Sequence, residues 1–339
     1  MITMLTKPTF FKKDNNIGGA EEFKKCLPVN VNTSFTTMAP AIATVEQQRL
    51  KPFLGKKLFD KAATYYESSG TEGSDQVMNE LVALIQMAVV RLAYWDSFDQ
   101  LSVMMSDDGI SDTHGENRAY RYQADRLKES LLRQGFAYLN QAIGWCMENI
   151  GKLPEFKESE YYSERQESVI HSLKEFEKIA SLNGDFFLFS KMREYIAQTE
   201  SMELPFRIGQ SLTELLTKHR DDPRAERLLR SAQGFVAHWS LAEAVPFLCI
   251  VITPQGPVVV SEESTGSVSG KVSNPPRTEL IGALQQRHRD MAERYIGQLV
   301  TFCKQNANDY PEIAEIGIAT NHEKTALHRD NRGKKTFLV

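Results

Sequence analysis

The tripeptide Ala-x-Trp occurs twice in the same setting, at 93–95 and at 237–239, and this repetition limits the possible folds more than any other feature of the chain. Around both tryptophans, apolar residues match at a constant separation of 144 positions and recur at spacings of three and four, as on one face of an amphipathic helix. Beyond each tryptophan the apolar residues alternate up to Gly109 and Gly256, which predicts a short strand followed by a turn.

Further blocks match in the same order on both sides of this corner. Upstream, a Pro-Phe-x-Gly turn at 52–55 is matched, with one inserted residue, by Pro-Phe-x-x-Gly at 205–209. Downstream, matching residues separated by 157 positions continue as far as the Pro-Glu pairs at 154–155 and 311–312. Because the separation changes only where a loop insertion would be tolerated, we infer an internal duplication.

The pattern predicts a fold that is mainly α with short β-hairpins. Each unit is expected to run helix, Pro-Phe-x-Gly turn, helix, long helix, hairpin, long helix. The expected parts are an extended N-terminal arm at 1–33, a helical repeat unit at 34–156, a connecting helix at 157–187, a second helical repeat unit at 188–312 and a basic C-terminal tail at 313–339.

A set of residues that match between the units is expected to anchor each unit structurally. These residues are Trp95, Trp239, Pro52, Phe53, Gly55, Pro205, Phe206 and Gly209. If a tryptophan ring is fully buried, truncating it to Ala is expected to cost about 3–5 kcal/mol.

Composition excludes several classes of protein. The 339 residues carry a net charge of −4 and 41% are hydrophobic, as in an ordinary globular protein without the basic footprint of a nucleic-acid binder. The apolar runs at 81–90 and 244–252 are shorter than the roughly 20 residues needed to cross a bilayer, so no membrane contact and no secretory leader are expected. The four cysteines form no CxxC pair and are expected to be buried thiols in a reducing compartment.

Motifs that suggest catalysis fail on closer comparison. The loop GSVSGK at 266–271 is one residue too short between its glycines for a phosphate-binding loop, and His-Arg-Asp at 288–290 and 328–330 lacks the other parts of a kinase. The acidic cluster at 107–116 is interpreted as a solvated hairpin tip, with an incidental cation site as the alternative, and His238 as a core histidine. We therefore predict no catalytic residue, no cofactor and no metal, and expect a binding or structural protein rather than an enzyme.

Several of these segments resemble one known family. They are the Pro-Phe-x-Gly turn at 52–55, the helix end LAYW at 92–95, DDGI at 107–110 and AYRYQADRLKESLLRQGF at 119–136. Over roughly residues 34–312 the chain resembles a protein family of Bacteroides-type phages and prophages, whose neighbours in kind are the head–tail connector, or head completion, proteins of tailed phages. The resemblance implies a virion structural protein at the head–tail junction, assembled in the bacterial host cytoplasm.

The resemblance further implies the portal protein and tail or neck proteins as partners, and a homo-oligomeric ring of about twelve copies. In the basic tail, Lys334, Lys335, Phe337 and Leu338 are expected to bind an acidic portal surface, or alternatively to contact DNA in the channel. Two other interpretations stay open: a non-virion cytosolic adaptor or regulatory protein, and an enzyme whose site forms between the two units.

Overall fold

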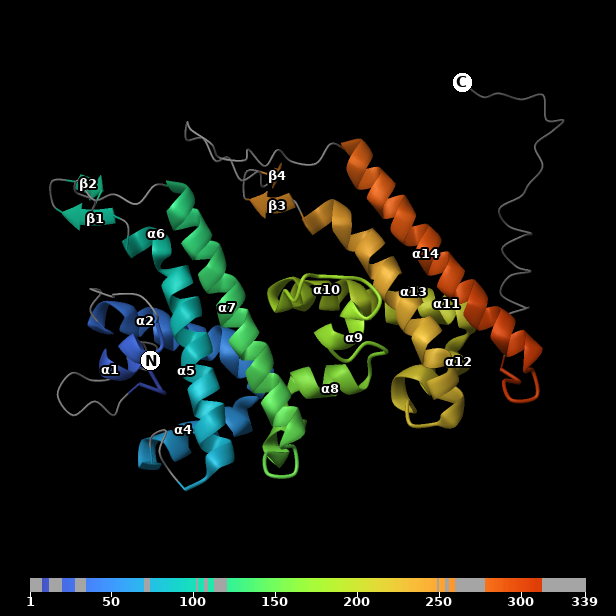
Figure 1. Ribbon diagram of the computed structural model, residues 1–339, viewed down its shortest axis with the longest axis horizontal. Coiled ribbons are helices and arrows are strands. Elements are labelled where there is room, and N and C mark those ends of the chain that lie inside the picture. The colour runs from blue at the N-terminus through green and yellow to red at the C-terminus, as the bar shows by residue number, and fades with distance from the viewer. Residues whose placement is uncertain are drawn as a thin grey trace. The chain divides into compact units, whose positions relative to one another are not determined.

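The chain folds into two compact, helical units (Figure 1). The computed structural model describes residues 8–11, 20–27, 35–69, 74–101, 103–106, 109–112, 121–248, 250–253, 256–259 and 278–312. Of these, the first unit takes those in Met1–Arg165 and Leu182–Ser190, and the second takes those in Gln166–Ser181, Lys191–Val260 and Pro275–Val339. Each unit is described by itself below.

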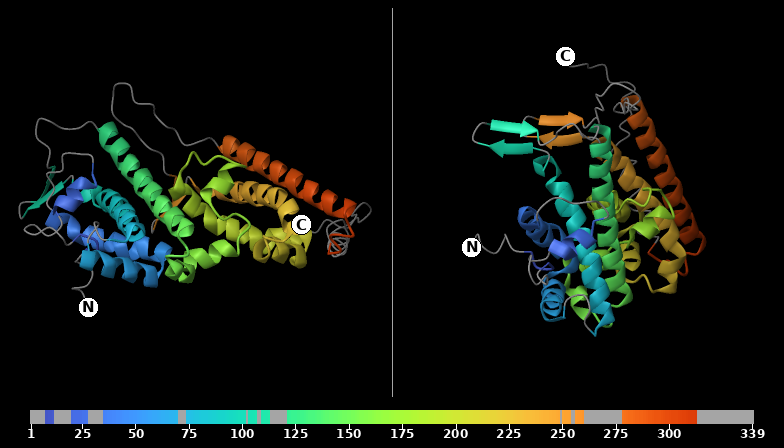
Figure 2. Two further views of the ribbon diagram at one scale, coloured as in Figure 1. Left: turned by 60° about the horizontal axis from the view of Figure 1, so that its bottom comes forward. Right: turned by 60° about the vertical axis from the view of Figure 1, so that its left-hand side comes forward.

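In the first unit the long helices α5 and α7 lie side by side (Figure 2). In sequence order this unit contains α1 (Ala20–Lys25), α2 (Phe35–Val45), the π-helix η2 (Glu46–Leu50), α3 (Lys51–Leu54), α4 (Lys56–Ser69), α5 (Gln76–Asp96), α6 (Phe98–Leu101), β1 (Val103–Ser106), β2 (Gly109–Asp112), α7 (Arg121–Glu148), the 3-10 helix η3 (Pro154–Glu158) and α8 (Glu160–Gln166), whose last residue belongs to the second unit.

The second unit repeats this order, with α13 and α14 side by side. Its elements are α9 (Leu173–Glu177), α10 (Phe186–Gln198), whose first residues belong to the first unit, the π-helix η4 (Thr199–Glu203), α11 (Leu204–Ile208), α12 (Gln210–Lys218), α13 (Pro223–Leu248), β3 (Ile250–Thr253), β4 (Gly256–Val259) and α14 (Thr278–Gln305). In both units a π-helix leads into a short helix, a glycine, a further helix and the long helices.

Helices define this fold. Each unit has one antiparallel strand pair, which comes between its two long helices in the sequence. The pairs are β1 with β2 in the first unit and β3 with β4 in the second, and each strand has four residues. A two-stranded pair of this size is not stable by itself in water. The prediction of a mainly α fold is confirmed.

Helix α5 forms the centre of the first unit. Its N-cap is Asp75, whose carboxylate accepts hydrogen bonds from the backbone N–H groups of Val77 and Met78 at 2.9 and 3.3 Å. By length and composition α5 could cross a membrane, with a mean hydropathy of 1.4 over its most apolar window. However, 72% of that window is buried inside the protein, as in the core helix of a globular protein.

The register between the two units differs from the predicted one at the Pro-Phe motif, because no residue is inserted there. A single separation of 154 positions relates the buried residues and the glycines around it. The related pairs are Leu50 with Leu204, Leu54 with Ile208, and Gly55 with Gly209. Consequently Arg207 takes the place of Phe53, and Phe206 takes that of Pro52. The predicted insertion came from aligning identical side chains, whereas burial and backbone conformation set the register that the structure has.

Glycine is required at the end of the short helix in both units. Gly55 ends α3 with φ of 78° and ψ of 156°, and Gly209 ends α11 with φ of 85° and ψ of 159°. Only glycine adopts this region without strain. At Gly55 there is also no room for a side chain, since a Cβ atom would lie 2.8 Å from the Cβ of Ser159.

Part of the predicted N-terminal arm is packed into the first unit. Phe10 and Phe23 are fully buried and Phe11 is 2% exposed. The ring of Phe10 lies edge-on to Phe59 of α4, with the ring centroids 5.4 Å apart. Phe10 and Phe11 lie in a segment without helical or strand periodicity, which is why the sequence pattern alone suggests an arm. Phe23 lies in the short helix α1, so the predicted arm at 1–33 is not extended throughout.

The predicted connecting helix at 157–187 is not one helix. It is replaced by the short helices α8 and α9 and by non-helical chain between them. Within the predicted helix, Asn183 and Gly184 have positive φ values of 57° and 71°, just before α10 begins. The break has a physical cause, because the backbone amides near residue 169 bond to a buried carboxylate rather than to helical carbonyls.

Candidate functional site

Among the described residues, each unit buries one glutamate in the first turn of its π-helix. Glu46 is 0% exposed and Glu200 is 9% exposed. The two residues correspond, since 200 − 46 gives the separation of 154 found for the surrounding core. Burying a carboxylate is costly unless hydrogen bonds replace those of water, so the partners of each glutamate indicate what the position does.

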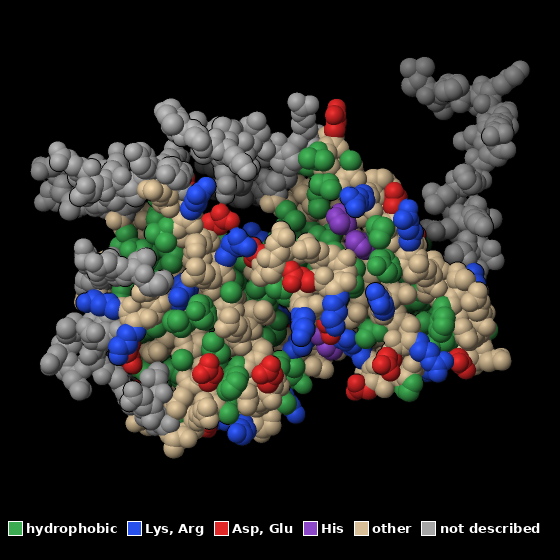
Figure 3. Space-filling view, in the orientation of Figure 1, with side chains coloured by type: hydrophobic (Ala, Val, Ile, Leu, Met, Phe, Trp, Pro, Cys, Tyr) green, Lys and Arg blue, Asp and Glu red, His purple; other side chains and the backbone are tan. Residues whose placement is uncertain are grey.

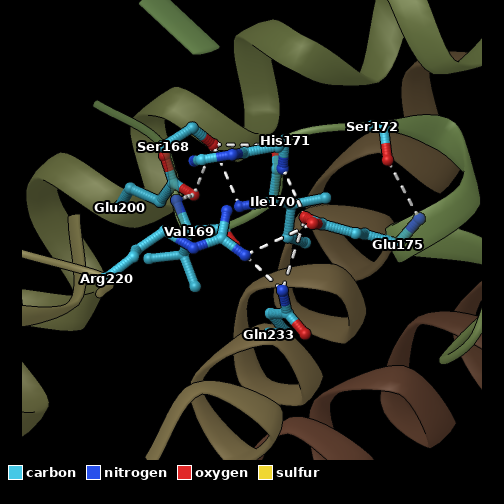
Figure 4. A network of polar contacts seen from close by, with 9 residues as sticks. All are labelled: Ser168, Val169, Ile170, His171, Ser172, Glu175, Glu200, Arg220 and Gln233. Carbon is cyan, nitrogen blue, oxygen red and sulfur yellow. Dashed lines mark hydrogen bonds and ion pairs between the residues drawn. The ribbon is translucent and has the colours of Figure 1, made fainter. Parts of the chain in front are cut away.

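In the second unit, Glu200 faces the non-helical segment at 168–170 (Figure 4). Its Oε1 accepts hydrogen bonds from the hydroxyl of Ser168 at 2.9 Å and from the backbone N–H of Val169 at 2.7 Å. The carbonyl of Val169 accepts a bond of 3.2 Å from the side-chain amide of Gln233 on α13. One residue of the segment is thus held through both its N–H and its carbonyl.

The first unit contains the same arrangement. The carboxylate of Glu46 accepts from the backbone N–H groups of Thr9 at 2.7 Å and Phe10 at 3.1 Å. The carbonyl of Phe10 accepts a bond of 2.7 Å from the side-chain amide of Gln86 on α5. Gln86 and Gln233 are 147 positions apart, not the 144 that relates α5 to α13, so the arrangement is shared although one of its residues is not matched in sequence.

A second carboxylate extends the network of the second unit (Figure 4). Glu175 of α9 accepts from the backbone N–H of His171 at 2.8 Å, while the hydroxyl of Ser172 accepts from the N–H of Glu175 at 3.2 Å, as in a capping box. The guanidinium of Arg220 reaches Glu175 with an Nη2–Oε1 distance of 3.3 Å. The segment is therefore tied at both of its ends.

The chemistry of Glu200 is that of a structural group. Burial raises its pKa to about 7, while hydrogen bonds from Ser168 and Val169 and the charge of Arg220 act in the opposite direction. Such a pKa suits a general acid or base, but the accepting oxygen is already occupied by two bonds to the segment. We call Glu46 and Glu200, each with the segment it binds, the glutamate latches.

The two predicted tryptophan anchors, Trp95 and Trp239, are half-buried rather than fully buried. An arginine covers each ring: the guanidinium carbon of Arg49 lies 5.1 Å from the centroid of Trp95, and that of Arg207 lies 5.1 Å from Trp239. Each arginine also pairs with a carboxylate at 2.9 Å. The exposed side of each ring is thus closed by a cation rather than by apolar side chains.

Truncating Trp239 to Ala is therefore expected to lower the free energy of unfolding by about 1–3 kcal/mol, below the range for a fully buried ring. A half-buried ring loses less apolar area, and the stacked arginine contributes only about 0.5–1 kcal/mol. Urea unfolding of the variant checks this. A loss above about 4 kcal/mol would show that the ring carries more of the core than its exposure indicates.

Two histidines meet across the long helices of the second unit. The Nδ1 atoms of His238 on α13 and His288 on α14 are 3.0 Å apart, and the two ring planes are inclined by 31°. The ring of His238 also stacks on Tyr295, with centroids 5.7 Å apart. Burial lowers the pKa of His238 to about 4, aided by His288 and Arg287, and burial and Arg287 lower the pKa of His288. His238 is buried, as predicted, whereas its contact with His288 was not predicted.

The other predicted anchors differ between the units. Phe53 packs against Tyr161 and Phe186, with ring centroids 5.4 and 6.2 Å away. Phe206 is 47% exposed and anchors nothing, because the register places it at the exposed position of Pro52. Pro52 and Pro205 stand in the first turns of α3 and α11, where the missing N–H of proline is tolerated.

Some predicted features cannot be placed. The tail residues, the loop at 266–271, the His-Arg-Asp at 328–330, the acidic side chains at 107–116 and the side chain of Cys249 lie outside the described residues. The other cysteines, Cys26, Cys146 and Cys303, are buried free thiols as predicted, and burial raises their pKa values to about 11, 12 and 11. In the His-Arg-Asp at 288–290, Arg289 is engaged in a 3.0 Å ion pair with Glu243.

Exposed apolar side chains concentrate in the second unit. Among the described residues seven large hydrophobic side chains are exposed, and six of them belong to this unit. Four of the six lie where α13 ends and α14 begins, and we call them the α13–α14 apolar end. They are Phe247, Leu248, Leu280 and Leu284.

Comparison with known proteins finds the same module twice. One family model matches residues 50–166 and again residues 200–320, together more than half of the chain. The chain belongs to this family. It is described as a family of unknown function (DUF6712). No curated protein and no solved structure matches the chain.

The two DUF6712 matches agree with the internal duplication inferred from the sequence. Each match begins within a π-helix and includes the pair of long helices that follows. Within the described residues no group of three or more His, Cys, Asp or Glu side chains is placed to hold a metal ion. Both DUF6712 modules contain the glycine turn and the tryptophan, and the glutamate latch lies at or just before the start of each. Arg49, which covers Trp95, lies just before the first match, whereas Arg207, which covers Trp239, lies within the second.

Sequence reasoning missed the latches although a signal for them exists. Phe35 and Phe189 are identical residues separated by 154 positions, and the same separation pairs Glu46 with Glu200. A carboxylate at a matched position within an otherwise apolar row indicates a buried polar group with fixed partners. The partners themselves have no such signal, because they lie in segments without periodicity.

Proposed function

We propose that this protein is a virion structural subunit, an adaptor that forms a ring between portal and tail. The proposal rests on the resemblance to head–tail connector proteins and on a duplicated module built from long helices. A ring subunit needs a heterologous interface, in which one face docks on a different face of its neighbour. Long helices supply stiff, extended faces for such docking.

The observation that carries the proposal is the α13–α14 apolar end. Phe247 is 57% exposed and Leu280 is 54% exposed. Figure 3 shows hydrophobic side chains gathered where α14 begins. Apolar patches of this kind on a soluble protein are typical of protein–protein contact sites. We assign this end to the contact with a neighbouring ring subunit or with the portal.

The basic tail supplies a second contact in this proposal. Lys334 and Lys335 would face an acidic portal surface, with Phe337 and Leu338 as apolar anchors, or approach DNA in the channel. A tail that orders on its partner places the entropic cost of ordering at the assembly step, which makes assembly sequential. Deleting residues 321–339 is then expected to abolish association with particles while leaving the helix content unchanged.

The decisive experiment is to label this protein in mature particles from its source phage or prophage and to image them by electron microscopy. Label at a single vertex between head and tail is the expected result. Unlabelled particles from a host that expresses the protein would contradict the proposal and favour a non-virion adaptor or an enzyme.

A matched pair of variants tests the apolar end itself. Leu284 on α14 and Leu127 on α7 correspond, since 284 − 127 is 157, and both are exposed to nearly the same degree, 37% and 39%. Leu284→Asp is expected to block particle association, while Leu127→Asp, outside the apolar end, leaves it intact. Loss with Leu127→Asp but not with Leu284→Asp would assign the contact to the first unit instead.

A further inference from the structure

The histidine pair is a feature of the second unit alone. In the first unit the corresponding positions hold Tyr94 and Leu131, since 238 − 94 is 144 and 288 − 131 is 157, the separations that relate the same helices elsewhere. Two facing positions without an imidazole in one module thus both carry an imidazole in the other. Because both positions differ from the first unit in this way, the second unit has two imidazole nitrogens, which are potential metal ligands of the same kind, facing each other.

The distance between the two nitrogens suits a chelated metal ion. Metal–nitrogen bonds of about 2.0–2.1 Å separate two ligand nitrogens by about 2.9 Å at a right angle and by about 3.4 Å in a tetrahedron. The Nδ1 atoms of His238 and His288 are 3.0 Å apart, close to the right-angle value. Right angles are the preference of Cu²⁺ and Ni²⁺, which favour square-planar or tetragonal sites.

The surroundings hold one ring and leave the other accessible. His238 is buried and its ring stacks on Tyr295. This stacking needs Gly234, because a Cβ atom there would lie 2.4 Å from the tyrosine ring. His288 is half-buried, and Figure 3 shows histidine side chains on the surface of this unit. A metal ion can therefore approach from the side of α14.

The charges nearby select the class of metal. Arg287 acts on both imidazoles, and Arg289 is neutralised by its ion pair with Glu243. A net positive surrounding disfavours hard cations, which bind by charge to oxygen ligands. It is tolerated by transition metals, whose bonds to neutral imidazole nitrogen are largely covalent.

We propose that His238 and His288 form a two-histidine site for a square-planar divalent transition metal, Cu²⁺ above all, with both Nδ1 atoms as ligands and water at the remaining positions. Without metal, one Nδ1–H donates to the other Nδ1, as the 3.0 Å distance requires. When metal binds, the donor imidazole gives up its Nδ1 proton to solvent and takes one at Nε2, so the charge of the pair does not change. The site goes beyond the proposed function and does not depend on it.

The test is copper binding to the isolated full-length protein after treatment with chelator. Calorimetry is expected to show one tight Cu²⁺ per chain, with a tetragonal electron paramagnetic resonance spectrum that carries hyperfine coupling to two nitrogens. Bound metal is also expected to raise the melting temperature, because it binds the native state only. The double variant His238→Tyr, His288→Leu, which restores the residues of the first unit, should lose all three signals.

Controls separate this site from the other histidines of the chain. His219→Ala removes an exposed imidazole and is expected to leave copper binding unchanged. Circular dichroism checks that the double variant is folded, and the single variants His238→Tyr and His288→Leu should each lose the tight site. An unchanged stoichiometry and spectrum in the folded double variant would overturn the proposal, as would the absence of tight binding in the natural sequence.

Discussion

Replacing Glu200 with Ala is expected to lower the free energy of unfolding of the second unit by about 2–5 kcal/mol. The substitution leaves the N–H of Val169 without its acceptor in the interior, and the hydroxyl of Ser168 keeps only the carbonyl of Ile170 as an acceptor. Each unsatisfied buried group costs about 1–3 kcal/mol, and the missing side chain leaves a cavity as well. The rate of amide hydrogen exchange at Val169 measures the stability of this unit directly, and we expect it to become much faster. The midpoint of urea unfolding is expected to fall as well.

Glu46→Ala is the matched variant in the first unit, where the amides of Thr9 and Phe10 lose their acceptor. It should accelerate exchange at Phe10 without affecting Val169, and Glu200→Ala should do the reverse. Slow exchange at Val169 in the Glu200→Ala variant would show that the segment at 168–170 is held by other contacts.

The same latch predicts a dependence of stability on pH. Because the pKa of Glu200 is raised from 4.5 to about 7, the folded state binds its proton more tightly than the unfolded state does. The contribution is therefore complete below about pH 4.5 and is lost as the pH rises through 7, a change of up to about 3 kcal/mol. Glu200→Gln keeps the accepting oxygen and cannot titrate.

Glu200→Gln should match the natural protein in stability near pH 5 and exceed it by about 1–3 kcal/mol at pH 8. Parallel urea titrations at the two pH values measure the difference. If the two proteins differ by the same amount at both pH values, Glu200 does not titrate in this range.

Gly55→Ala is expected to destabilise the first unit by about 2–5 kcal/mol. The backbone at Gly55, with φ of 78° and ψ of 156°, costs a residue with a side chain about 1–3 kcal/mol. The new Cβ atom would also lie 2.8 Å from the Cβ and 2.9 Å from the Cα of Ser159, so backbone must shift, at a further cost of about 1–3 kcal/mol. Thermal and urea unfolding measure the loss.

Gly144→Ala provides the control for this variant. Gly144 lies within α7, and a Cβ atom there meets nothing within 4 Å beyond the neighbouring backbone of its own helix. Removing glycine from a helix interior should therefore stabilise by about 0.5–1 kcal/mol. If Gly55→Ala were as harmless as Gly144→Ala, neither the strained backbone nor the contact with Ser159 would exist in solution.

The features that the sequence predicted correctly are those governed by local rules. The long helices follow from apolar spacings of three and four, and the glycine turns follow from a backbone that other residues do not adopt. Duplication was recognisable for the same reason, because both copies must repeat these local demands. The register error at Pro52 and Pro205 arose where identical residues occur one position out of step with the buried ones.

The site shows the limit of this approach. Phe10 and Val169 lie in segments without periodicity, and long-range contacts hold them in place, among them the hydrogen bonds from their backbone N–H groups to Glu46 and Glu200. The predicted helix through Val169 is broken because the carboxylate takes the amide that a helix would use. Such competition is invisible in the sequence, since its outcome depends on what lies across the core.

By itself, the amino-acid sequence determined that this protein is helical and built from one module used twice, because secondary-structure periodicity and glycine conformations are local properties. Only the tertiary structure decided which polar groups are buried and what they meet. Glu200 meets the segment before its own module, Arg207 covers Trp239, and His238 meets His288 across two helices. The partners in these three pairs are 31, 32 and 50 residues apart in the sequence. The free energy of folding, rather than a regular spacing, brings them together.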